Sequence, residues 1–391
     1  RSSVWEAADV GSFDGLDSLC AITDVNALGQ SGPTQWQHDM EALAGRWRAF
    51  GWHASVIDGH DLNAILDALD QARRTKGRPT MILARTLKGK GISLAEGKNG
   101  WHGKAFKKGE ELDKVLAELR SQLIPGDNSM PAPQAPRTVS RPQPKKGSVG
   151  ASAHKLGDSV ATREAYGDAI ARLADGDDRV VALDGDVKNS TFSEKFEQRH
   201  KERFYQTFIA EQMMIGSAMG LAARGAIPFP STFAAFLTRA YDFIRMAAIS
   251  NLNIKMAGSH AGVSIGEDGP SQMALEDLAM CRAEPNMTVL YPCDGVSTEK
   301  LVGLMAYQPG PAYMRTSRPK TPVIYRPDET FVIGGLKVLR ESASDVATVV
   351  GAGVTVFEAL KAYDRLKASG THIRVIDLYS VQPVDKAALI A

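Results

Sequence analysis

The chain has 391 residues, of which 43% are hydrophobic and 23% are charged, and its formal net charge is +1. This length predicts two or three domains, and the nearly balanced charge argues against a nucleic-acid partner, because such a partner favours a basic face. No apolar run reaches the length of a membrane span, and the first residues do not have the pattern of a signal peptide. We therefore expect a cytoplasmic protein without a membrane partner.

Strands and helices are expected to alternate over the first 124 residues. Alternation at this spacing indicates a parallel sheet, and Asp61 is the expected N-cap of the second helix. The expected strands cover 18–24, 53–57 and 79–85, and the expected helices cover 34–50, 61–72 and 110–123.

Oxygen-bearing side chains follow the first expected strand. Asp24, Asn26 and Gln30 stand around a glycine turn, and carboxylate and amide oxygens are ligands that Mg²⁺ accepts. An Asx turn, which is common in such loops, explains the same residues. The pattern alone leaves both interpretations open.

A polar loop follows the third expected strand. Lys88, Lys90, His102 and Lys104 stand there among glycines, and together they are able to hold an anionic group such as a diphosphate. A solvated basic loop is the better explanation for the lysines, whereas His102 is less easily explained in that way.

Residues 125–150 interrupt the alternation. Six prolines fall there among Ser, Gln, Lys and Gly, with few apolar residues. This composition is typical of an extended, semi-rigid linker. We place the clearest domain boundary of the chain here.

A second series of strands and helices follows this linker, and a third begins near residue 331. In the third series, Gly351, Ala352 and Gly353 resemble a dinucleotide fingerprint that lacks its third glycine, which is a weak signal. The expected strands cover 180–183, 204–209, 227–230, 254–257, 289–291, 312–314, 347–350 and 374–376. The expected helices cover 161–167, 210–220, 231–239, 273–280, 296–305 and 356–368.

A glycine-rich loop over 258–272 joins two of these elements. Its four glycines and one proline exclude regular structure, and ligands of open α/β sheets bind at this end of the strands. Glycines alone would favour an ordinary turn. The loop also carries polar side chains that make a binding site the better interpretation, namely His260, Glu267, Asp268 and Gln272.

Three further features of the second series bear on function. Glu211 begins a helix whose next ten residues carry no other charge, so it either complements the helix dipole or serves catalysis. Phe233 and Phe236 lie three residues apart on an expected helix, a spacing more often found in a core than in a cofactor platform. Arg318 follows the last strand of the series, where a guanidinium is able to bind phosphate.

Long strings of the sequence resemble the transketolase family, whose enzymes depend on thiamine diphosphate. The resemblance runs through nearly the whole chain, and Gln272, where many microbial members place His, is similar to the branch that includes the animal enzymes. The strings are residues 3–7, 184–194, 231–236, 258–277 and 315–319.

The resemblance implies an α/β fold of consecutive doubly wound parallel-sheet domains of the thiamine-diphosphate-binding type, with the start of a third α/β domain. The implied parts are a partial pyrophosphate-binding domain (1–124), a Pro-rich linker (125–158), a pyrimidine-binding domain (159–325) and the beginning of a C-terminal domain (326–391).

The resemblance also implies roles for individual residues. Asn26 and Leu28 would ligate Mg²⁺, with Ca²⁺ or Mn²⁺ as alternatives, and the catalytic residues would be Glu211, His102 and His260. The cofactor would contact Gln30, Lys88, His102, Asp186, Glu211, Phe233, Phe236 and Gln272. The substrate would contact His102, Arg163, Ser190, His260, Asp268 and Arg318.

The implied activity is reversible transfer of a two-carbon ketol unit from a ketose phosphate to an aldose phosphate, a reaction of the pentose phosphate pathway. The resemblance also implies a homodimer with its active site at the subunit interface. A Gly-Asp-Gly-Glu motif that family members carry just upstream does not occur here, and 385–391 ends inside an expected helix. We therefore expect a fragment, or one piece of a split enzyme, that is inactive alone. A deoxyxylulose-phosphate or dihydroxyacetone synthase and a non-catalytic transketolase-like partner are the alternatives.

Overall fold

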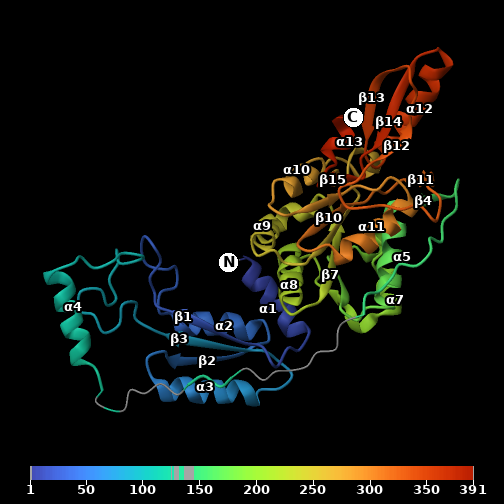
Figure 1. Ribbon diagram of the computed structural model, residues 1–391. Helices are drawn as coiled ribbons and strands as arrows, with labels where there is room; N and C mark the ends of the chain where they lie inside the picture. Colours follow the sequence, from blue (N-terminus) through green and yellow to red (C-terminus); the bar gives the residue numbers. More distant parts are fainter. Residues whose placement is uncertain (1, 125, 127–131, 136–144, 391) are drawn as a thin grey trace. The chain divides into compact units, whose positions relative to one another are not determined.

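A computed structural model describes residues 2–124, 126, 132–135 and 145–390 (Figure 1). The rest of the predicted linker, residues 125, 127–131 and 136–144, lies outside the described residues. The chain divides into two compact units, Arg1–Ser140 and Arg141–Ala391. Each unit is considered by itself below.

The first unit is built on a three-stranded parallel sheet in the order β1-β3-β2. Its strands are β1 (Cys20–Val25), β2 (His53–Asp58) and β3 (Thr80–Arg85), and its helices are α1 (Ser2–Phe13), α2 (Met40–Ala49), α3 (Leu62–Arg74) and α4 (Glu110–Ser121). The predicted parallel sheet is thus confirmed. Asp61 caps α3 as predicted, because its side chain accepts hydrogen bonds from the backbone N–H groups of Asn63 and Ala64.

The predicted helix over 34–50 is wrong in its first turns. The helix begins only at Met40, where the Asp39 side chain accepts a hydrogen bond from the Ala42 N–H. Asp39 supplies the N-cap, and this local bond decides where the helix starts. Trp47 of α2 packs against Trp5 and Trp52, with ring centroids 5.2 and 4.9 Å apart, in the core of this unit.

The second unit contains a seven-stranded sheet in the order β15-β9-β10-β8-β7-β5-β6. All neighbours in it are parallel except the edge strand β15, which runs antiparallel to β9. Its strands are β5 (Val180–Asp184), β6 (Phe204–Gln206), β7 (Ile227–Phe233), β8 (Lys255–Ser259), β9 (Thr288–Leu290), β10 (Ala312–Arg315) and β15 (Ser380–Gln382). A two-stranded antiparallel pair joins β4 (Ser159–Ala161) to β11 (Lys320–Pro322).

Helices cover both faces of this sheet. Val180 and Ala182 of β5 belong to one buried cluster and Val181 and Leu183 to the other, as alternation along a strand requires. Figure 1 shows the sheet between the two helix layers, which confirms a doubly wound α/β fold. One layer holds α5 (Thr162–Ala174), α7 (Glu194–Arg199) and α11 (Gly295–Tyr307), and the other holds α8 (Glu211–Ala223), α9 (Tyr241–Ile249) and α10 (Asp277–Arg282).

The last part of the chain forms a smaller sheet in the order β12-β14-β13. It comprises β12 (Lys337–Arg340), β13 (Asp345–Gly351) and β14 (His372–Asp377), with α12 (Thr355–Ala368) packed on it and α13 (Lys386–Ile390) after it. Because β15 follows β14 and pairs with β9, this part contributes the edge strand of the seven-stranded sheet. Among the described residues, no helix has both the length and the apolar character that a bilayer crossing needs.

Three predicted elements of the second unit have wrong bounds. The helix over 231–239 is instead the end of β7 and a 3₁₀ turn, η2 (Phe236–Ala240), because residues 231–233 pair with residues 257–259 of β8. The helix over 273–280 begins only at Asp277, and the strand over 204–209 ends at Gln206.

Residues 145–158, the last part of the predicted linker, lie against the second unit. The Gly147 N–H donates to the Tyr307 hydroxyl of α11 over 2.6 Å, and Arg172 of α5 donates to the Ala151 carbonyl over 2.9 Å. Val149 is buried. This stretch has no helix or strand, as predicted, but it is packed onto α5 and α11.

We predict that Asp294→Ala destabilises the second unit. This fully buried carboxylate caps α11 by accepting from the Ser297 N–H, and it also accepts from the N–H groups of Ile324 and Tyr325 over 2.8 and 3.0 Å. Alanine would leave these buried donors unpaired, at a cost on the order of 2–4 kcal/mol. Asp158→Ala, which removes one exposed backbone bond to Lys155, should cost less than about 1 kcal/mol. Equal free energies of unfolding for the two variants in urea titrations would contradict this assignment.

Candidate functional site

Three adjacent parallel strands of the second unit bring polar and aromatic side chains to one sheet edge. β7 ends at Phe233, β8 ends just before His260, and β10 ends three residues before Arg318. The carboxyl edge of an open α/β sheet is where ligands bind. The predicted site residues of β7, β8 and β10 therefore meet at one edge.

His260 is the centre of this cluster. Its Nε2 lies 3.3 Å from Nη1 of Arg163, its Nδ1 lies 2.9 Å from Oγ of Ser259, and its ring stacks on Phe233 with centroids 3.9 Å apart. Its backbone has φ of 58°, a left-handed conformation that is uncommon outside glycine. Burial, followed by the nearby Arg163 guanidinium, lowers the pKa of His260 to about 4, so the imidazole is neutral near pH 7.

Two arginines flank His260, and each is held in place. Arg163, in the first turn of α5, donates to the Ser190 carbonyl over 2.8 Å. Burial and the neighbouring Arg318 lower its pKa. Arg318 pairs with Asp268 over 2.8 Å and with Glu267 over 3.0 Å. Sequence reasoning placed all these residues near a ligand, and the structure brings them together.

The predicted loop over 258–272 starts two residues too early, because Gly258 and Ser259 are the end of β8, and residues 260–272 are irregular except for one short turn. A 3₁₀ segment, η3 (Val263–Asp268), is broken at Gly266, which has φ of 75°. Gly262 and Gly269 on either side have φ of 79° and 80°. These conformations suit glycine and turn Asp268 back toward Arg318. Gln272, half-buried, donates its N–H to the Gly269 carbonyl.

Glu211 begins α8, as predicted, and is 2% exposed. Its Oε2 accepts a hydrogen bond from Nη1 of Arg239 over 2.8 Å, a partner that sequence reasoning did not identify. Because the N-terminus of a helix favours negative charge, the carboxylate is stabilised from two sides. A buried carboxylate in such a place is able to hold a proton-bearing nitrogen of a ligand.

Phe233 and Phe236 are stacked, with ring centroids 5.2 Å apart and planes at 13°. The premise that they share a helix is wrong, because Phe233 ends β7 and Phe236 begins η2. Phe233 is enclosed between His260 and Phe236, whereas Phe236 is half-buried. Phe236 therefore offers the accessible ring. Asp186 is exposed in the loop after β5, with φ of 66°.

In the first unit, the loop after β1 borders a cavity of about 510 Å³ that Asn26 and Leu28 help to line. The Asn26 side-chain oxygen accepts the Leu28 N–H over 3.0 Å, which is an Asx turn, and its amide donates to Asp24 over 3.0 Å. The Thr86 hydroxyl also hydrogen bonds to Asp24. Gln30 follows in the same loop.

Mg²⁺ prefers oxygen ligands such as these carboxylate, amide and carbonyl groups. The oxygen atoms of this loop are therefore chemically suited to bind a hard cation. Among the described residues, no group of three or more His, Cys, Asp and Glu side chains is placed to hold a metal.

Lys88 and His102 contact each other in the first unit. Nζ of Lys88 lies 3.0 Å from Nδ1 of His102, although the two residues are 14 positions apart. Because an ammonium only donates, Nδ1 accepts and the neutral imidazole carries its proton on Nε2. This pair provides two donors to an anion.

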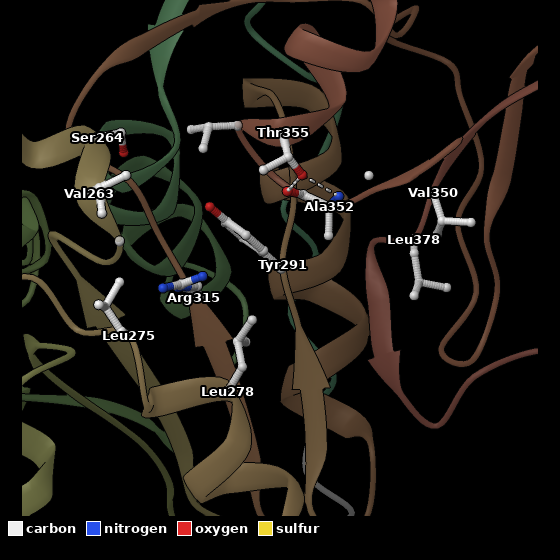
Figure 2. Close-up of a pocket in the computed structure, with 13 residues that line it drawn as sticks. Val263, Ser264, Leu275, Leu278, Tyr291, Arg315, Val350, Ala352, Thr355 and Leu378 are labelled. Carbon is white, nitrogen blue, oxygen red and sulfur yellow. Dashed lines mark hydrogen bonds between the residues drawn. The ribbon is translucent and has the colours of Figure 1, made fainter. Parts of the chain in front are cut away.

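A separate cavity of about 450 Å³ lies beside the loop over 258–272, where β9, β10 and β13 end. Figure 2 shows Arg315 next to Tyr291, with Leu275 and Leu278 on one side and Ala352 and Thr355 on the other. The weak dinucleotide fingerprint at Gly351 thus lines this cavity. Arg315 is 8% exposed and pairs with Asp277 over 3.1 Å, so its charge is already balanced.

Comparison with known proteins gives matches along most of the chain. Family models match for the thiamine diphosphate binding domain of transketolase over residues 2–124, for its pyrimidine binding domain over 158–323 and for its C-terminal domain over 334–391. Together the three matches span most of the chain.

Two of the similar relatives are animal proteins. Transketolase-like protein 2 of Mus musculus is 51% identical over 394 residues, and transketolase of Homo sapiens is 48% identical over 391. Each comparison covers 100% of this chain and 62% of the relative, so the chain spans less than two thirds of their length. A crystal structure of Campylobacter jejuni transketolase matches with a TM-score of 0.79 and 23% identity, over 99% of this chain and 66% of that one, and so shares the fold.

We predict that His260 makes stability depend on pH. Its folded-state pKa of about 4 lies below 6.5, the ordinary value for a histidine side chain. The unfolded state therefore takes up a proton first as the pH falls, and the contribution of neutral His260 to stability declines between these two values. In thermal unfolding, we compare the Tm of the wild type with that of His260→Asn. The difference, wild type minus variant, should decrease as the pH is lowered from about 7 to about 4.5. A difference that stays constant or grows would contradict the assignment.

Proposed function

Because this chain belongs to the transketolase family, we propose that it serves reversible transfer of a two-carbon ketol unit from a ketose phosphate to an aldose phosphate, with thiamine diphosphate as cofactor. The observation that carries the proposal is Glu211, a 2% exposed carboxylate at the start of an otherwise uncharged helix segment. It lies in the region that matches the pyrimidine binding domain. The reaction belongs to the pentose phosphate pathway.

In this proposal the second unit holds the aminopyrimidine part of the cofactor. Glu211 would hydrogen bond to a ring nitrogen, and the half-buried ring of Phe236 would pack on the pyrimidine, supported from behind by Phe233. Thiamine diphosphate, when bound, supplies a nucleophilic carbon and an electron sink for cleaving the bond beside a carbonyl. Asp186 and Gln272 would contact the cofactor from loops of the same unit.

The first unit would hold the diphosphate end. Asn26 through its side chain and Leu28 through its carbonyl would ligate Mg²⁺, with Ca²⁺ or Mn²⁺ as alternatives, and Gln30 lies in the same loop. Lys88 and His102, which already contact each other, would donate to the diphosphate, and His102 would also face the substrate. The match of residues 2–124 to the thiamine diphosphate binding domain supports this assignment.

The sugar phosphate would lie at the sheet edge of the second unit. Arg163 and Arg318 would bind its phosphate, with Ser190 beside Arg163, because guanidinium groups match phosphate oxygens in geometry. His260 and Asp268 would bind its hydroxyls. Arg318 pairs with Glu267 and Asp268, and a phosphate oxygen would take the place of one of these carboxylates at the guanidinium.

We also propose that the protein is a homodimer in the cytoplasm. α8 carries apolar residues around its whole circumference, which is typical of a helix buried on all sides, yet Met213 and Met219 are only half-buried. On the neighbouring α9, Met246 and Ile249 are 41% and 53% exposed. A second copy would cover this surface. The three free cysteines are consistent with a reducing compartment.

The test is Glu211→Gln in a polypeptide that carries this chain together with the remaining family segments. Because glutamine cannot stabilise the proton-bearing ring as a carboxylate does, turnover from pentose phosphates should fall about 100-fold or more, with thiamine diphosphate binding weakened but retained. Glu276→Gln, on an exposed acid, is the matched control. The 391-residue chain alone should be inactive.

Unchanged turnover in Glu211→Gln would remove this residue from the mechanism. Activity with pyruvate or formaldehyde in place of an aldose phosphate would instead identify one of the related synthases. No turnover in the intact wild-type polypeptide, despite bound thiamine diphosphate, would favour a non-catalytic partner.

A further inference from the structure

The sequence contains one Asn-Gly dipeptide, Asn99-Gly100, and it lies in the polar loop that carries Lys88 and His102. Both residues of the dipeptide are exposed, in a stretch without helix or strand. Asparagine is chemically labile in proteins, because the backbone nitrogen of the next residue can attack its side-chain amide. The fate of Asn99 therefore depends on how the Gly100 nitrogen is held.

Nothing in the described part of the chain holds that nitrogen. Among the residues that the structure describes, none forms a hydrogen bond with the Gly100 N–H or with the Asn99 side chain. Gly100 has φ of 88°, and apart from its chain neighbours no heavy atom lies within 4 Å of the place where a Cβ would stand. Because glycine also leaves the backbone free to rotate, the Gly100 nitrogen can approach the Asn99 amide.

Two other exposed asparagines are held differently. The N–H that follows Asn63 donates to the Asp61 side chain over 3.3 Å, and the N–H that follows Asn189 donates to the Val187 carbonyl over 2.8 Å. Each of these N–H groups must give up its acceptor before its nitrogen attacks, and that loss has a cost. The structure thus distinguishes Asn99 from asparagines of similar exposure.

We propose that Asn99 is a site of spontaneous deamidation. The Gly100 nitrogen forms a bond to Cγ of Asn99 and closes an imide ring, while the bond from Cγ to the amide nitrogen breaks. The amide leaves as ammonia and takes the proton of the Gly100 N–H. Water then opens the imide at either carbonyl, which gives aspartate or isoaspartate. The attack is intramolecular, and the attacked carbon is already close to the nitrogen.

Either product places a carboxylate three residues before His102, where asparagine is neutral. In the proposed function, on which this part of the inference rests, the contacting pair of Lys88 and His102 donates to the diphosphate. A negative charge in the same loop repels that anion. Isoaspartate also adds a methylene to the main chain just before Trp101, which packs against Phe106 with ring centroids 4.9 Å apart. Deamidation should therefore weaken binding of thiamine diphosphate.

Peptide mapping of the purified 391-residue chain measures the modification directly. After incubation of the folded chain at neutral pH, cleavage after glutamate releases residues 97–110, and mass spectrometry detects the change from amide to acid. We expect aspartate and isoaspartate to form at position 99 roughly tenfold faster than at Asn63 or Asn189. The rate should rise with pH, because the attacking nitrogen must lose its proton. Asn99→Gln should remove the signal, and equal rates at the three asparagines would overturn the proposal.

Titration of the complete polypeptide with thiamine diphosphate tests the effect on the cofactor. Asn99→Asp carries the charge of the product and should weaken binding roughly threefold or more, whereas the uncharged Asn99→Gln should bind as the wild type does. Equal affinity of Asn99→Asp and Asn99→Gln would overturn this effect. A wild type that binds no thiamine diphosphate would contradict the proposed function and the effect together, while faster deamidation at Asn99 would still support the modification site.

Discussion

The candidate site of the second unit depends on the parallel pairing of β7, β8 and β10. Residues 231–233 pair with 257–259, and Arg315 pairs with Gly258, so the three strands end at nearly the same level. This register places Phe233, His260 and Arg318 at one edge although they are far apart in sequence. A shift of one residue in the pairing of these strands would turn side chains on them to the other face of the sheet. A change in the strand register would therefore also disrupt the site.

The charged side chains at this edge are paired with one another or with neutral partners. Arg318 is paired with Asp268 and Glu267, and Arg163 donates to a backbone carbonyl while its neighbour His260 is neutral. An incoming phosphate can replace carboxylate partners of a guanidinium without a large change in geometry. The same logic applies to Glu211, whose charge is met by Arg239 and by the start of α8.

Local signals in the sequence allowed much of the fold and part of the site to be predicted. The start of α8 at Glu211, the cap at Asp61 and the irregular course of residues 260–272 all follow from nearby residues. The predicted helix over 231–239 failed because strand pairing with β8 overrode the spacing of its aromatic residues. The contact between Arg163 and His260 spans 97 positions, and no local pattern indicates it. The role of Arg163 in binding the phosphate and that of His260 in binding the sugar hydroxyls came from family resemblance and remain predictions.

The most direct test of this account is calorimetric titration of the purified chain with ribose 5-phosphate and with ribose. If the sheet edge of the second unit is a sugar-phosphate site, ribose 5-phosphate should bind more tightly than ribose, and Arg318→Leu should abolish the difference. Arg326→Leu, which breaks an exposed ion pair with Asp328, should leave it intact. Equal binding of the two sugars, or a preference that survives Arg318→Leu, would contradict the assignment of this edge to the substrate.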